Sequence, residues 1–467
     1  MYDIKGVVCM NRQSIPTKKL TLFALTWPIF IEILLHMLMG NADTLMLSQY
    51  SDESVAAVGV ANQILFIVIV ILSFVVTGTT ILISQFLGAK KEQEAANVAT
   101  LSVGLNALVG IVLSLIFVFF SSYFLRAMNL PEELMEEGLV YIRLVGGFTI
   151  LQSLIFTFTA ILKSYGFTRD VMYITMGMNA INVIGNYLFI FGPFGLPILG
   201  VEGVAISTVA SRFLGLLVVI YYFYRKLSIK LSLANMFAFK KNNGHEIIKI
   251  GIPSAGEHLS YNTSQICITF FIAMLGTQVI TTKIYTQNIM MLIFLFALAL
   301  SQGTQILIGR KIGAQQIEEA YQLGIKTLKM ALLISLSLAS IFYLISEPLF
   351  SIFTSNTDII QQGTLLLLLT IILEPGRTFN LVIGSALRAT GDTRFPAIIG
   401  IASMWGLSVP LAYFFGIYLG YGLPGIWVAF ILDEWIRGII MLLRWRSRVW
   451  VKMSFIKNEK VESLTAS

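Results

Sequence analysis

The side chain with the clearest capacity for chemistry is Asp43, a carboxyl group inside an apolar stretch that begins near Leu20. An ionisable residue within a membrane-spanning stretch costs about 2.5–3.5 kcal/mol on insertion scales, so it is a functional hypothesis by default. A carboxyl group partly shielded from water can exchange a proton near neutral pH. Asp43 is therefore a candidate proton carrier. The alternative is a carboxylate that is merely solvated at the outer interface.

Amide side chains form a second candidate group. Asn179, Asn182 and Asn186 occur in one apolar segment, and the last two lie on one stripe of a helix. Three amides in one membrane helix must find partners. We expect them either to line an aqueous cavity with Gln152 and Thr208 or to tie neighbouring helices together.

Two glutamates follow prolines in the same way. Glu32 lies four residues after Pro28 and Glu257 four residues after Pro253. Glu32 is also about three helical turns before Asp43, on nearly the same face, and is a candidate cavity residue. Each glutamate either takes part in coupling or satisfies backbone groups freed by the proline. We expect the structural role for Glu32 and leave both roles open for Glu257.

An acid and a base stand three residues apart at Glu374 and Arg377, where they can neutralise each other. Pro375 lies between them and loosens the helix. The pair either fixes a kink or opens when a cation or proton binds. Glu434 and Arg437 repeat the spacing, and there we expect a structural pair.

The elements that position these residues follow from composition. Of 467 residues, 56% are hydrophobic and 12% charged, whereas a soluble domain is about 25% charged. This excludes a soluble, disordered or fibrous protein. Charge-free runs reach the roughly 20 residues that a membrane-spanning helix needs, and they are too long for barrel strands. The sequence predicts an all-α integral membrane protein.

Twelve spans are expected, in two similar halves. The segment 78–89 reappears as 303–314, and the same displacement along the chain relates 162–169 to 387–394. We call this constant displacement, which carries Gly78 to Gly303, the repeat shift. Six spans per unit is an even number, so the two copies are parallel repeats. The expected spans are 20–42, 54–84, 94–122, 135–161, 171–192, 201–223, 247–274, 284–309, 321–345, 359–386, 395–418 and 422–443.

Lysine and arginine set the orientation. They accumulate in segments that are cytoplasmic if both termini are inside, which predicts a multi-pass protein of the inner or plasma membrane. The net charge of +7 follows from this bias, and no nucleic-acid partner is needed to explain it. The expected parts are a tail 1–19, an N-lobe 20–224, a linker 225–246, a C-lobe 247–446 and a tail 447–467.

The sequence lacks the motifs of several other functional classes. It has no phosphate-binding loop, no His/Glu metal motif and no Ser/His/Asp constellation, so we expect no ATP-driven pump, enzyme, metal site or cofactor. We expect small-molecule substrates, a lipid environment and a monomer.

Taken together, the motifs resemble those of the multidrug and toxic compound extrusion (MATE) family over about 17–449. The residues that carry the resemblance are Pro28 with Asp43-Thr44, 78–89, 162–169, Asn182-x-x-x-Asn186, 200–207 and 387–394.

This resemblance implies a V-shaped pair of six-helix lobes that rock to give alternating access. It also implies export of drug-like, cationic or amphipathic compounds in exchange for H⁺ or Na⁺. The implied coupling group is Asp43 with Asn182, Asn186 and Thr208, although several family members carry Asp where this chain has Asn186. We therefore expect H⁺ coupling through Asp43.

In the C-lobe the family pattern is less well matched. Other family members carry an acid on the seventh span about two turns after its proline. Here that place is Tyr261, and Glu257 lies one turn nearer the proline. Na⁺ stays open, and Glu257, Tyr261, Glu374 and Arg377 are the candidates for C-lobe coupling or substrate contact.

Two other functions compete with drug export. A flippase for lipid-linked saccharides, from the same superfamily, would favour a basic central cavity, whereas the mid-span charges here include Glu32 and Glu257. A membrane-embedded enzyme would use His36 or His258, but neither histidine is duplicated in the other half.

Overall fold

The computed structural model describes residues 20–229, 231 and 241–456, and the side chains of 241–243 are not part of the description. The predicted tail 1–19, residues 230 and 232–240 of the predicted linker and the end of the C-terminal tail (457–467) lie outside the described residues. All regular elements of the described part are helices.

The first half of the chain forms seven α-helices joined by short turns. A π-helical turn, η2 (Ile142–Gly146), joins the fourth to the fifth. The helices are α1 (Leu22–Ser48), α2 (Asp52–Gly88), α3 (Glu92–Ala127), α4 (Met135–Tyr141), α5 (Thr149–Tyr165), α6 (Thr168–Phe191) and α7 (Gly200–Lys226).

The second half contains eight α-helices in the described part of the chain. Its helices are α9 (Lys241–Ala273), α10 (Thr277–Gly313), α11 (Ile317–Leu344), α12 (Ser346–Ser351), α13 (Thr357–Thr390), α14 (Arg394–Ser403), α15 (Val409–Tyr413) and α16 (Gly422–Arg446). Two π-helical turns, η4 (Met404–Ser408) and η5 (Phe414–Tyr418), interrupt the segment that was expected to be one regular span, 395–418.

In the described part, nine helical segments are long and apolar enough to cross a membrane, and the bent pair Glu132–Gly146 and Thr149–Tyr165 makes a tenth. Helices α9 and α16 are of similar length but carry more polar residues, including the acidic pair Asp433 and Glu434. Most helices extend a few residues beyond the expected spans. Thus α7 continues to Lys226 and α9 begins at Lys241, both inside the predicted linker.

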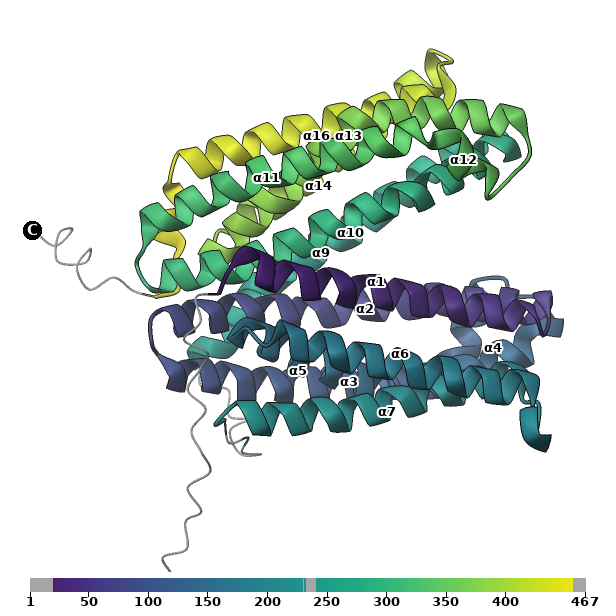
Figure 1. Cartoon of the computed structure of the whole chain (residues 1–467), viewed down its shortest axis with the longest axis horizontal. Helices are drawn as coiled ribbons and strands as arrows, with labels where there is room; N and C mark the ends of the chain where they lie inside the picture. Colours follow the sequence, from purple (N-terminus) through teal and green to yellow (C-terminus); the bar gives the residue numbers. More distant parts are fainter. Residues whose placement is uncertain (1–19, 230, 232–240, 457–467) are drawn as a thin grey trace, which may run out of the picture.

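The two halves form two groups of helices that meet at one end of the molecule and diverge toward the other (Figure 1). Helices α1 and α2 of the first half pack against α9 and α10 of the second. We call the end where the groups meet the closed end. Helix α2 and helix α10 both finish there, at Gly88 and Gly313.

Glycine allows the two backbones to touch at the closed end. A Cβ atom on Gly88 would overlap the carbonyl oxygen of Arg310, and one on Gly313 would overlap the carbonyl oxygen of Gln85. Any side chain would therefore force the helices apart. These four positions belong to the repeated segment found in the sequence, 78–89 and 303–314.

Two crossed hydrogen bonds add to this contact. The Gln85 side chain donates to the carbonyl of Ala389 at 2.8 Å, and the Arg310 side chain donates to the carbonyl of Ser164 at 2.7 Å. The repeat shift relates the two donors to each other and the two acceptors to each other. The duplication therefore extends to the contact between the halves.

Candidate functional site

The carboxyl group of Asp43 is buried between α1 and α6. Asp43 is only 7% exposed, and its Oδ1 accepts a hydrogen bond of 2.6 Å from Nδ2 of the fully buried Asn186. The structure therefore contradicts the alternative in which Asp43 is a carboxylate merely solvated at the outer interface. The predicted neighbours Asp43 and Asn186 are brought into direct contact.

The amide stripe of α6 faces both α1 and α7. Asn182 donates to the hydroxyl of Thr208 at 3.3 Å, and Asn179 donates to the carbonyl of Leu35 at 2.6 Å. The amide oxygens of all three asparagines are buried and accept no hydrogen bond from the described residues. Gln152, on α5, makes no hydrogen bond to this group within the described part of the chain.

Asp43 differs from the other buried acids in having no counter-ion. Six acidic residues are buried in the described part of the chain, and within it Asp43 alone has no ion-pair partner within 4 Å. A buried carboxylate without a counter-ion is strongly disfavoured, whereas a protonated carboxyl group is tolerated. The other five are Glu32, Glu374, Asp392, Asp433 and Glu434.

The two proline-linked glutamates are held in matching ion pairs. Glu32 pairs with Lys163 and Glu257 with Arg388, each at 3.0 Å. Lys163 and Arg388 are themselves related by the repeat shift. Glu32 contacts the side chain of Lys163, from α5, and no hydrogen bond to a backbone group freed by Pro28 is present among the described residues. Its structural role stays a prediction.

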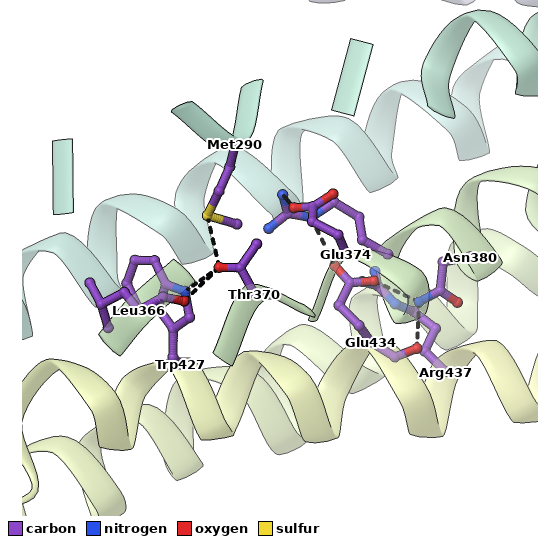
Figure 2. Close-up of polar contacts among 9 residues, drawn as sticks. Met290, Leu366, Thr370, Glu374, Asn380, Trp427, Glu434 and Arg437 are labelled. Atoms are coloured by element: carbon purple, nitrogen blue, oxygen red, sulfur yellow. Dashed lines mark hydrogen bonds and ion pairs between the residues drawn. The ribbon is translucent and has the colours of Figure 1, made fainter. Parts of the chain in front are cut away.

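The second half contains a continuous polar cluster (Figure 2). Glu374 and Arg377 form the expected ion pair at 2.6 Å, and Arg377 also lies 3.8 Å from Glu434. Arg437 pairs with Glu434 at 2.8 Å, and the Asn380 side chain donates to Glu434 at 2.6 Å. The two pairs that the sequence treated separately are thus one network.

Two further groups extend this network. Asp433 lies 3.4 Å from Arg437 and accepts a short hydrogen bond from Ser403. Tyr261, which is 38% exposed, is close enough to interact electrostatically with Arg377 and Glu434. Three carboxylates (Glu374, Asp433 and Glu434) therefore face two guanidinium groups, so the cluster has one more acidic group than basic groups.

One charged residue was missed by the sequence analysis. Arg212 lies on α7, one turn after Thr208, and interacts electrostatically with Asp43 and Tyr141. Its Nε is buried and has no acceptor among the described residues. The signal was present in the sequence, because Arg212 is the one charged residue apart from Glu202 in the expected span 201–223.

The duplicated helical unit, the buried charges within it and the contact between the halves define a multi-pass membrane transporter. The MatE family model matches residues 28–188 and 253–414, so the chain belongs to the MATE family. It is a transporter and not an enzyme, which removes the alternative built on His36 and His258.

Two relatives are similar to this chain over nearly its whole length. An uncharacterized transporter, YisQ of Bacillus subtilis, is 53% identical over 435 residues, 93% of this chain and 96% of that protein. A probable multidrug resistance protein, NorM of Thermotoga maritima, is 28% identical over 455 residues, 97% of this chain and 98% of the relative.

Solved structures share the fold. A crystal structure of a MATE protein in the bent conformation has a TM-score of 0.85 at 20% identity, covering 96% of each chain. An outward-facing multidrug resistance transporter of the MATE family has a TM-score of 0.84 at 21% identity, covering 91% of this chain and 95% of its own.

Proposed function

We propose that this protein is a secondary antiporter that exports organic cations or amphipathic drug-like compounds in exchange for H⁺, with Asp43 as the proton carrier. The observation that carries the proposal is that Asp43 alone among the buried acids of the described chain lacks a counter-ion. A proton or a cationic substrate can neutralise it, but both cannot do so together. Such competition makes the movement of one depend on the other.

The substrate class is supported by the relatives. NorM of Thermotoga maritima and of several Bacillus species are described as probable multidrug resistance proteins. A carboxylate released from its proton attracts a positively charged compound through simple electrostatics. We propose a monomer as the transporting unit.

For the architecture, we propose that α9 and α16 also cross the membrane. Their lengths of 33 and 25 residues support this, and they give twelve spans in two parallel six-helix halves. The divergence of the halves away from the closed end supports a V-shaped transporter that rocks about that contact (Figure 1). The form described by the structure is then the one open on the far side.

The charge distribution supports placing the closed end and both termini in the cytoplasm. Basic side chains gather near the closed end and acidic ones at the opposite end of the first half. The residues are Lys90, Lys91, Lys163, Arg310 and Lys311 at the closed end, and Asp52, Glu53, Glu132, Glu133 and Glu136 at the other.

The test is ethidium efflux from proteoliposomes under an imposed pH or Na⁺ gradient. The parent should move ethidium when the pH gradient is applied, and Asp43→Asn should not. Asp52→Asn is the matched control, because it makes the same change at an exposed residue and should behave as the parent. Equal transport by Asp43→Asn and the parent would contradict the assignment.

Na⁺ is the second arm of this experiment. The unoccupied amide oxygens of Asn182 and Asn186, together with Asp43, are the oxygen ligands that hard cations prefer. Transport driven by Na⁺ and not by pH would replace the proton with Na⁺ at the same carboxylate. If neither gradient moves an organic cation, drug export fails and the lipid-linked saccharide alternative takes its place.

A further inference from the structure

A single arginine stands near the middle of α7 with no ion pair. Arg212 lies about halfway along Gly200–Lys226, where a charged side chain is most costly to hold in a membrane. Within the described chain it has no carboxylate within 4 Å, and its buried Nε has no acceptor. Because an unpaired arginine in a membrane-spanning helix costs free energy, Arg212 is a candidate functional residue.

Four other arginines of the described helices do have partners. Arg310 donates to the carbonyl of Ser164, and Arg377, Arg388 and Arg437 each form an ion pair with a carboxylate. Arg212 differs from these four, because within the described residues it has neither a carboxylate nor a carbonyl as a partner.

The duplication shows what is missing around Arg212. The repeat shift relates Arg212 to Arg437, which pairs with Asp433 and Glu434. The positions equivalent to those two acids in the first half are Thr208 and Val209, neither of which carries a charge. The first half thus has the arginine but not its carboxylates.

The groups around Arg212 come from several helices. From α1 they are Asp43 and His36, and from α4 it is Tyr141, whose hydroxyl donates to Asn62 of α2 at 3.2 Å. Helix α6 supplies the neutral amide of Asn186, which holds Asp43. Asp43 is the one acid among these neighbours.

We propose that Arg212 is the internal counter-ion of Asp43, which pairs with the carboxylate once its proton has left. The proposal rests on the proton role of Asp43 given above. When the O–H bond breaks, the proton passes to water and the carboxylate keeps the bonding electron pair. The guanidinium group then replaces the proton as the neutralising partner, and Asn186 continues to hold the other face of the carboxylate.

This role makes Arg212 a positioning residue for proton release. Without it, the ionised carboxylate would have only neutral hydrogen-bond partners in a dry environment, and the proton would be released only at higher pH. With it, the ionised carboxylate stays neutralised until a cationic substrate displaces the guanidinium group. The site then alternates between a protonated acid beside an arginine and an ion pair that a cation can enter.

The experiment is an infrared pH titration of the purified protein without substrate. The carboxyl C=O band that disappears in Asp43→Asn reports the protonation of Asp43 directly. We expect Arg212→Gln to move the midpoint of this band upward by about one pH unit or more, because an opposite charge is removed. Arg212→Lys should keep the midpoint near that of the parent, because the charge is retained.

Arg225→Gln is the matched control, since it makes the same change at an exposed arginine of the same helix and should leave the Asp43 band in place. A midpoint unchanged in Arg212→Gln would overturn the counter-ion role while leaving Asp43 as a proton carrier. If the parent shows no Asp43 band that titrates, the proton role itself fails. Should Arg212→Gln fold poorly, Arg212→Lys carries the test, because a midpoint that moves upward although the charge is retained would overturn the counter-ion role.

Discussion

At the scale of single residues, a comparison of the two halves distinguishes the charges that form matching ion pairs from a carboxyl group that has no equivalent. The ion pairs Glu32–Lys163 and Glu257–Arg388 occupy equivalent places in the two halves at the same distance. Asp43 breaks this symmetry, because its equivalent in the second half is the buried Ile268. The symmetric pairs hold helices together, and we propose that the unmatched and unpaired Asp43 carboxyl group is the one that exchanges a proton.

The paired glutamates should therefore matter for stability. Glu32→Gln leaves Lys163 without its partner at a site where both side chains are mostly buried, and the loss should be up to about 3 kcal/mol of unfolding free energy. The double variant Glu32→Gln, Lys163→Gln should recover much of this loss, because no charge is left unpaired. Thermal unfolding in detergent measures both, and a double variant no more stable than the single one would contradict the pairing.

The hydrogen bond from Asn186 should matter for transport more than the one from Asn182. Asn186→Ala removes the only hydrogen-bond donor that the described residues give to Asp43, so we expect roughly tenfold slower pH-driven efflux, as for the loss of a hydrogen bond to a charged group. Asn182→Ala is the matched comparison, because Asn182 bonds Thr208 instead. Equal losses in initial efflux rate would show that both asparagines act through helix packing alone.

How much of the site could be predicted depended on whether partners are close in sequence. Asp43 and the pair Glu374–Arg377 could be found from one segment at a time. Lys163, the partner of Glu32, lies far away along the chain, and only the folded helix bundle brings the two side chains together. Arg212 could have been noticed as a charge inside an expected span. Only the folded structure shows that its Nε has no acceptor among the described residues.

At the scale of elements, helix positions followed from composition, but interruptions and contacts did not. The apolar runs predicted the long helices to within a few residues at most ends. The π-helical turns η2, η4 and η5 break two expected spans, and each contains a glycine, but so does the uninterrupted helix α2. Such turns depend on local packing, which a one-dimensional pattern does not contain.

The glycine contact between α2 and α10 gives a prediction at this scale. Gly88→Val places side-chain atoms where the Arg310 carbonyl lies, so the closed end should not close and efflux should fall about tenfold or more. Gly59→Val is the matched control on the same helix, because a Cβ there meets no atom within 4 Å. Efflux assays with equal amounts of protein compare the two, and parent-like efflux from Gly88→Val would contradict the role of this contact.

At the scale of the whole molecule, the repeat was the most informative feature of the sequence. One constant shift predicted two similar halves, and the crossed bonds Gln85–Ala389 and Arg310–Ser164 show that the same shift describes their contact. The sequence could not predict which end is closed, because that depends on the conformational state and not on the fold.

The central claim is that Asp43 carries the proton that is exchanged for substrate. The most direct measurement is proton movement driven by an ethidium gradient in proteoliposomes that contain a pH-sensitive dye. The account predicts that the parent and Asp52→Asn move protons against the ethidium flow, whereas Asp43→Asn moves none. Proton movement of equal size in Asp43→Asn would contradict it.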